Sequence, residues 1–185
     1  MLTRVGVLLT SSRHVSGLYE IGSARLSDAL NNTLESVVRL TNAALGRLGN
    51  PYANEPAPFA VVPKAQIALV YAEVEATRQV GRRMAAYVPK QTTELLVLVA
   101  GLRVRGRGHA SGPLDPNELQ RLVAQAGDRF VVLTDAHLAL DVEGTTERDV
   151  GVAMLNARHI QFVASGEEKP VTVEGPPPAR SVQSA

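Results

Sequence analysis

The chain has 185 residues, with 19 basic residues (Lys and Arg) against 18 acidic ones and no Cys or Trp. The absence of cysteine excludes disulfides, thiol nucleophiles, iron–sulfur clusters and thiolate zinc sites. Aromatic residues make up only 4% of the chain, so we expect aliphatic cores and few side chains on which nucleic-acid bases can stack.

No segment of the sequence is suited to entering a membrane. No apolar run approaches the roughly 20 residues that a spanning helix needs. The apolar run at residues 5–9 ends at polar residues and is too short for the core of a secretory signal. We therefore expect a soluble, cytoplasmic protein without a membrane partner.

Two blocks of sequence recur at one offset, which predicts that the chain is one unit written twice. Residues 40–45 (LTNAAL) match 133–138 (LTDAHL), and residues 62–70 match 155–163, in both cases 93 positions apart (133 − 40 and 155 − 62). Each unit alone is small enough for its core to be marginal, so we expect the units to share buried surface or to oligomerise. The expected organisation is a first repeat at 1–72, a linker with weak helical periodicity at 73–92, a second repeat at 93–165 and a disordered Pro-rich tail at 166–185.

Each unit opens with a predicted strand hairpin. Residues 4–10 and 14–21 flank a polar turn, and residues 94–99 and 102–107 flank Ala-Gly. Matching residues 15–17 to 104–106 needs a shift of 89 (104 − 15), so the second unit carries four more residues (93 − 89) before its next strand.

The four extra residues fall in a predicted helix. Residues 23–32 begin with Ser23, which can cap a helix, and end at Asn-Asn. Residues 115–127 are better formed, with Asp115 as N-cap, Pro at the first helical position and Gly127 as the stop. One extra turn of helix accounts for about four residues.

Two strands complete each predicted unit, at 36–45 and 60–71 and again at 129–141 and 150–164. The intervening residues, 46–58 and 142–149, have the composition of loops. The fold class is therefore mainly β with small helices (α+β), as two tandem β-β-α-β-β repeats. Because four short strands and one helix cannot bury both faces of an open sheet, we expect small barrels or curled sheets, which can be Sm-like, OB-like or split-barrel in shape.

Three short motifs resemble those of an uncharacterised bacterial domain of unknown function. The first half has RLSDALN at residues 25–31, LTNA at 40–43 and VVPKAQI at 61–67, and the second half keeps LTDA at 133–136 and LNARHI at 155–160. The resemblance covers most of residues 4–164, and the second half departs from it at the helix. It implies two tandem copies of that domain and carries no activity, because the Leu and Ala of the motifs are expected in a core, the Asn or Asp in a turn, and no residue is an evident nucleophile.

Basic residues cluster before and within the second hairpin. Arg103, Arg105 and Arg107 alternate with apolar residues or Gly, so on a strand their guanidinium groups leave from one face. With Arg82 and Arg83 nearby in sequence, they form a candidate site for anions or nucleic-acid backbone. The alternative is a solvated strand face neutralised by the acidic residues that follow.

Other chemistry has weaker support in the sequence. Residues 106–112 read G-x-G-x-x-x-G, which is not the dinucleotide fingerprint. Asp135 and His137 share a strand face and suggest metal ligands only if His159 or His109 joins them. No G-x-S-x-G or H-E-x-x-H motif occurs.

The sequence therefore favours a non-catalytic binding or assembly module, with no metal site and no cofactor. We expect it to act through a sheet edge or barrel rim, with a protein partner or with itself. The alternative is binding of RNA backbone through the face that carries Arg103, Arg105 and Arg107.

Overall fold

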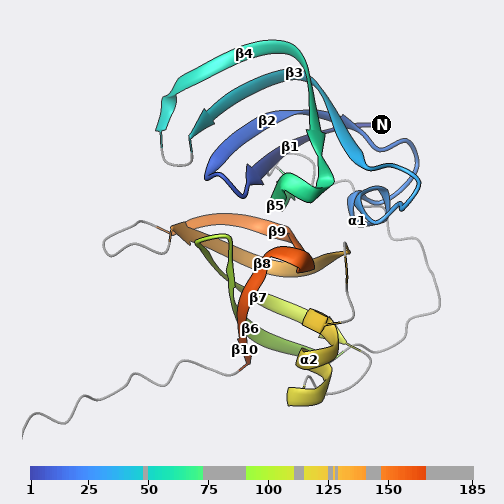
Figure 1. Ribbon diagram of the computed structural model, residues 1–185, viewed down its shortest axis with the longest axis vertical. Helices are drawn as coiled ribbons and strands as arrows, with labels where there is room; N and C mark the ends of the chain where they lie inside the picture. The colour runs from blue at the N-terminus through green and yellow to red at the C-terminus, as the bar shows by residue number, and fades with distance from the viewer. Residues whose placement is uncertain are drawn as a thin grey trace, which may run out of the picture.

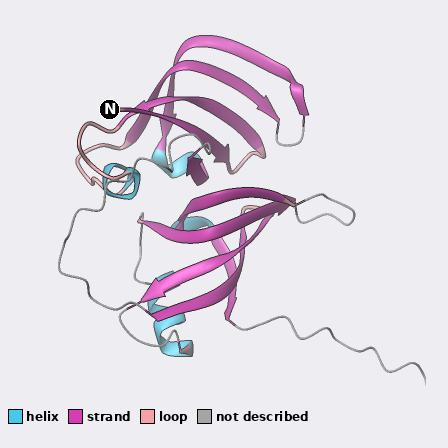
Figure 2. Ribbon diagram, turned by 180° about the vertical axis from the view of Figure 1, so that it is seen from behind, coloured by secondary structure: helices cyan, strands magenta, loops and turns pink. Residues whose placement is uncertain are grey.

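The protein is mainly β, and among the residues that the structure describes ten antiparallel strands form one sheet in the order β10-β6-β7-β8-β9-β5-β1-β2-β3-β4 (Figure 1). The computed structural model describes residues 1–47, 50–72, 91–110, 115–124, 127, 129–140 and 147–165. Within these ranges no helix is long and apolar enough to cross a membrane. Figure 2 shows how little of this part is helical. The elements are β1 (Leu2–Leu9), β2 (Arg13–Glu20), α1 (Leu26–Leu30), β3 (Val37–Arg47), β4 (Asn50–Pro63), β5 (Ile67–Ala72), β6 (Gln91–Val99), β7 (Leu102–Ala110), α2 (Pro116–Ala124), β8 (Phe130–Leu140), β9 (Arg148–Asn156) and β10 (Ile160–Ser165).

The first half of the sheet (β1–β5) and the second half (β6–β10) have the same strand order and register. The first runs β5-β1-β2-β3-β4 and the second β10-β6-β7-β8-β9. Val38 pairs with Val62 and Val131 pairs with Leu155, so both members of the pair move by 93 positions. The proposed linker overlaps β6, which begins at Gln91, and the rest of it lies outside the described residues, as does the proposed tail.

Each half has five strands rather than the four expected. The stretches expected to form one long strand, 60–71 and 150–164, are each interrupted by a 3-10 turn, at Lys64–Gln66 and at Ala157–His159. The turns are anchored alike, because Lys64 N donates to Ser36 O and Ala157 N to Arg129 O, both at 2.9 Å. The 3-10 turn redirects the chain, so β4 and β5 lie on opposite sides of their half.

The expected loop at residues 46–58 is wrong for most of its length, because β4 begins at Asn50. Its prolines suggested a loop, since proline cannot donate a hydrogen bond to a neighbouring strand. Proline is tolerated on an edge strand, where the missing N–H faces solvent. β4 is such a strand, since β3 is the one strand that neighbours it among the described parts of the chain.

The prediction of closed barrels is also wrong. β5 does not return to β4 of its own half but pairs with β9 of the other half. Within the described residues the sheet therefore stays open, with β4 and β10 as its two edges. Figure 1 shows the strands of each half bending around their own interior.

The two helices follow the sequence signals to different degrees. In α2 the N-cap prediction is confirmed, because the Asp115 carboxylate accepts a hydrogen bond from Glu118 N at 2.9 Å. In α1 the N-cap is Arg25 and no side chain caps it, so the expected cap by Ser23 is wrong. Lys64 contacts the other end of this short helix, where its Nζ donates a hydrogen bond to Asn32 O, just after the C-cap, at 2.8 Å.

The seam between β5 and β9 joins the two cores. Both cores take side chains from both halves, and all of these side chains are buried. The core of the second half includes Leu8, Ala68, Leu69 and Tyr71 from the first half, and the core of the first half includes Phe130 and Met154 from the second half.

Hydrogen bonds from side-chain amides also cross the seam. Asn31 is bonded twice to Phe130, donating to its carbonyl at 3.0 Å and accepting from its N–H at 2.7 Å. The Asn156 side chain donates to Lys64 O at 3.1 Å and to Ile67 O at 3.0 Å. These amides hydrogen-bond backbone groups of the opposite half where the two halves meet.

A polar cluster lies at one end of the seam. Nε2 of His14 lies 2.9 Å from the Tyr71 hydroxyl, and the Arg148 guanidinium stacks over the Tyr71 ring at 5.0 Å. A Cβ at Gly6 would collide with this ring, so glycine makes room for it. Burial, with a smaller effect from Arg148, lowers the pKa of His14 to about 4.

Replacing a side chain that one half contributes to the core of the other should destabilise both halves together. We expect Leu69→Ala to lower the free energy of unfolding by about 2–5 kcal/mol, as for other buried leucines. Urea unfolding followed by circular dichroism should still show one transition. Leu34→Ala is the control, because Leu34 is 93% exposed. A Leu69→Ala loss no larger than that of the control, or two separate transitions, would contradict the shared cores.

Acid should weaken the protein through His14. Its pKa falls from 6.5 to about 4 on folding. Between these two pH values the unfolded chain therefore binds a proton at this site, whereas the folded chain does not. We expect the free energy of unfolding to fall by about 1–2 kcal/mol between pH 6.5 and 5 for this reason. The loss should be largely absent in His14→Gln, and equal slopes of stability against pH in the two proteins would refute the assignment.

Candidate functional site

The three arginines of β7 alternate with buried residues, as the sequence pattern predicts. Arg103, Arg105 and Arg107 are partly or fully exposed, whereas Leu102 and Val104 between and beside them are buried. The strand therefore places the three side chains on one face of the sheet. Arg82 and Arg83 lie outside the described residues, so their proximity to this face stays a prediction.

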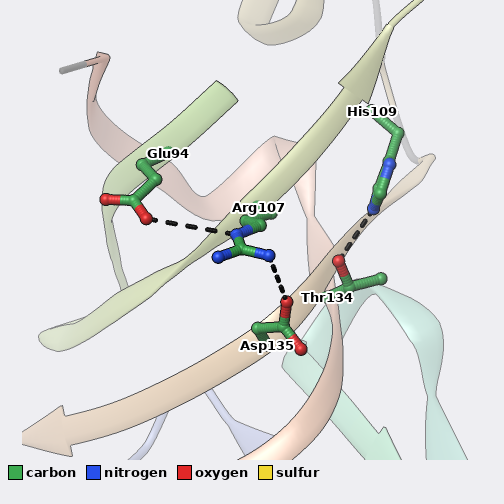
Figure 3. Close-up of polar contacts among 5 residues, drawn as sticks. All are labelled: Glu94, Arg107, His109, Thr134 and Asp135. Atoms are coloured by element: carbon green, nitrogen blue, oxygen red, sulfur yellow. Dashed lines mark hydrogen bonds and ion pairs between the residues drawn. The ribbon is translucent and has the colours of Figure 1, made fainter. Parts of the chain in front are cut away.

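Acidic side chains accompany the outermost of these arginines. Arg107 Nη1 lies 3.1 Å from the Asp135 carboxylate, and its Nε lies 4.0 Å from Glu94, which is opposite Arg107 in the register of β6 and β7 (Figure 3). All three side chains are exposed, so these ion pairs add little stability. Their consequence is electrostatic, because the carboxylates reduce the positive charge that a ligand would meet.

A β-bulge positions Asp135. The register between β7 and β8 shifts between Arg105 and Arg107, and Asp135 adopts a left-handed φ of 49°. Gly106 allows the close approach, because a Cβ there would lie 3.0 Å from Thr134 O. The first half has the same device, with a register shift after Ser16 and a φ of 47° at Asn42. The LT(N/D)A motif thus encodes a bulge.

Two of the three arginines line an open groove of about 470 Å³. Its polar wall holds Arg105 and Arg107 together with the acids Glu94 and Asp135, so the formal charges of these four residues balance. Ala164 and Ser165 of the edge strand β10 form another wall. We call this site the arginine groove. It is suited to small ligands of mixed charge rather than to a polyanion held by charge alone.

Arg103 is set apart from this groove. It is half-buried on β7 and is absent from the residues that line the groove. Its Nε is buried and has no hydrogen-bond partner among the described residues. The sequence therefore predicts the shared face correctly, but the structure brings only Arg105 and Arg107 together in one site.

The glycine and histidine motifs have structural explanations. Gly106 and Gly108 belong to β7 rather than to a loop. His109 Nε2 lies 2.7 Å from the Thr134 hydroxyl, and His159 Nε2 lies 2.7 Å from Ala65 O (Figure 3). In the described ranges, no three His, Cys, Asp or Glu side chains gather as a potential metal site.

The open edges of the sheet are a second candidate surface, and the individual residues of this surface were not singled out from the sequence. Phe59 and Val61 on β4 are 71% and 56% exposed, and Phe162 on β10 is 52% exposed. The sequence signal that points to them is the shift of 93 residues. It aligns Phe59 with Val152, Val61 with Met154 and Phe162 with Leu69, and these three counterparts lie at the seam.

Comparison of the chain with protein-family models, with curated proteins and with solved structures gives no match. The resemblance to an uncharacterised bacterial domain therefore rests on its motifs alone.

The balance of charge in the arginine groove predicts weak binding of nucleic acid. In fluorescence anisotropy we expect single-stranded RNA to bind no more tightly than the nonspecific range, about 1–100 µM. Removing the acids in Glu94→Gln/Asp135→Asn should strengthen binding. Tight, salt-dependent binding by the unmodified protein that is lost in Arg103→Ala/Arg105→Ala/Arg107→Ala would instead support the RNA hypothesis.

Proposed function

We propose that this protein is a non-catalytic assembly module that binds polypeptide by strand addition at β4 and β10. The observation that carries the proposal is the apolar surface of both open edges, formed by Phe59, Val61 and Phe162. An edge strand also presents unpaired N–H and C=O groups, which a strand from another chain can satisfy.

The composition of the edges supports this role. Natural edge strands are commonly protected by charged side chains. Residues 57–62 of β4 (APFAVV) and all of β10 (IQFVAS) carry no charge. These edges combine exposed backbone with exposed apolar side chains, as strand-accepting surfaces do.

We also infer that the two halves are repeats of one unit. The offset of 93 residues, the matched 3-10 turns and the matched bulges at Asn42 and Asp135 support this inference. We interpret each unit as a curled five-stranded sheet that leaves its edges available.

Binding of RNA backbone through Arg103, Arg105 and Arg107 is the second candidate. The stripe on β7 favours it, and the carboxylates of Glu94 and Asp135 count against it. We rank it below assembly because residues 59–62 and 160–165 of the two edge strands carry neither a charge nor a proline that would oppose the addition of a strand.

Site-specific photo-crosslinking tests the assembly function. A photoreactive phenylalanine analogue would be placed at Phe59, at Phe162 or at the control position Leu34, which is 93% exposed and lies outside the strands. In cells that naturally make this protein, we expect crosslinks to polypeptide from positions 59 and 162 at least several-fold above position 34. Equal yields at all three positions would refute the proposal.

A further inference from the structure

We propose that the polypeptide bound at each edge is a second copy of this chain, so that β4 of one copy pairs antiparallel with β10 of the next. This inference rests on the proposed assembly function and names its partner. It follows from the seam inside the chain, where a strand corresponding to β4 already pairs with a strand corresponding to β10.

The internal seam supplies the template. β9 and β5 pair in antiparallel register, with Leu155 opposite Leu69 and Met154 opposite Val70. Ala153 lies opposite Tyr71 in the same ladder. Figure 1 shows β5 and β9 side by side where the two halves meet.

β4 corresponds to β9 in its relation to the rest of its half. Val62 pairs inward with Val38 as Leu155 pairs with Val131, at the shift of 93 residues. The side of β4 that faces away from β3 is therefore the side on which β9 holds β5.

β10 corresponds to β5 in the same way. Phe162 pairs inward with Leu98 as Leu69 pairs with Leu8, and in both ladders a register shift lies beside this pair. The open side of β10 is therefore the side on which β5 holds β9. Each chain therefore carries both sides of a second seam, and among the described residues its own β4 and β10 are not paired with each other.

The correspondence fixes one register between copies. In each seam pair the β5 residue is replaced by the residue 93 positions later, and the β9 residue by the residue 93 positions earlier. Phe162 then lies opposite Val62 of the next copy, Val163 opposite Val61 and Ala164 opposite Ala60. Only this register repeats the internal seam pair for pair, and a slip of one residue would in addition turn every side chain to the other face.

The exposed apolar side chains of the edges fit this register. Leu69 is buried in the core of the opposite half, whereas its counterpart Phe162 is 52% exposed. Met154 is buried across the seam, whereas its counterpart Val61 is 56% exposed. Pairing between copies would bury these side chains as their counterparts are buried, and this accounts for their exposure in a single chain.

The prolines of β4 limit the ladder to the same short length. Proline on an edge strand turns its missing N–H away from the neighbour. Pro56 and Pro58 would leave that part of the open edge without donors, whereas Ala60 and Val62, at alternate positions further on, turn N–H groups to the same edge. Donors are thus available over the three pairs that the template requires.

The junction between copies should be weaker than the internal seam. The amide of Asn156, which donates twice across the seam, is replaced at the shift of 93 by Pro63. Val132 packs against the core of the first half, and its counterpart at the shift of 93 is the charged residue Arg39. We therefore expect reversible, concentration-dependent assembly. Because each junction joins two different edges, addition continues until the copies close into a ring or form a filament.

Blocking one edge at a time tests this geometry. Val61→Glu closes β4 and Phe162→Glu closes β10, both at exposed positions that should leave the fold intact. Light scattering should give a mass above 19.7 kDa that rises with concentration for the unmodified chain. Each variant alone should stay monomeric, whereas an equal mixture should form dimers and stop there. Leu34→Glu is the control and should assemble like the unmodified chain.

The register has a separate readout, because the chain contains no cysteine. Under mild oxidation, a mixture of Val61→Cys and Val163→Cys should give a disulfide-linked dimer, since opposite residues place their Cβ atoms about 4.5–5.5 Å apart. A mixture of Val61→Cys and Gln161→Cys is the control and should give several-fold less.

Three results would overturn the inference: a monomer at every concentration, dimers of Phe162→Glu alone, or equal disulfide yields in the two mixtures. The second result would indicate pairing of β4 with itself. Crosslinks from positions 59 and 162 to a different polypeptide, together with a monomeric chain, would leave the assembly function standing and remove only this partner.

Discussion

The exchange of apolar side chains across the β5 and β9 seam is the constraint on which this fold depends. Leu69 and Tyr71 complete the core of the second half, and Phe130 and Met154 complete the core of the first. A unit of about 70 residues buries a modest fraction of its surface. Side chains of each half therefore form part of the core of the other half. The hydrophobic core thus continues across the seam.

This way of burying surface explains why the sheet is open. A half that closed on itself would pair β5 with β4 and would leave Leu69 without the neighbouring core. The pairing of β5 with β9 satisfies that side chain and leaves β4 and β10 at the ends of the sheet. The arginine groove reaches the edge strand β10, because Ala164 and Ser165 line it together with Arg105 and Arg107. The two candidate surfaces are thus adjacent rather than independent.

Local patterns in the sequence predicted local structure well. The alternation along β7 placed the arginines correctly, and Asp115 marked the start of α2. Pairing was harder to predict, because closure of a half and pairing between halves satisfy the same hydrophobic pattern. The prolines of β4 suggested a loop, since their tolerance depends on which side of the strand is open. Glu94 and Asp135 meet Arg107 only through strand register and a bulge, neither of which composition reveals.

The bulge in the LT(N/D)A motif bears on how the two halves differ in chemistry. Asn42 and Asp135 both hold a left-handed φ, which these two residue types tolerate better than most. They have nearly the same shape and differ by one negative charge. The same backbone conformation therefore carries a neutral amide in one half and a negative charge in the other. At a bulge of this kind the local charge can differ between the halves without a change in the path of the backbone.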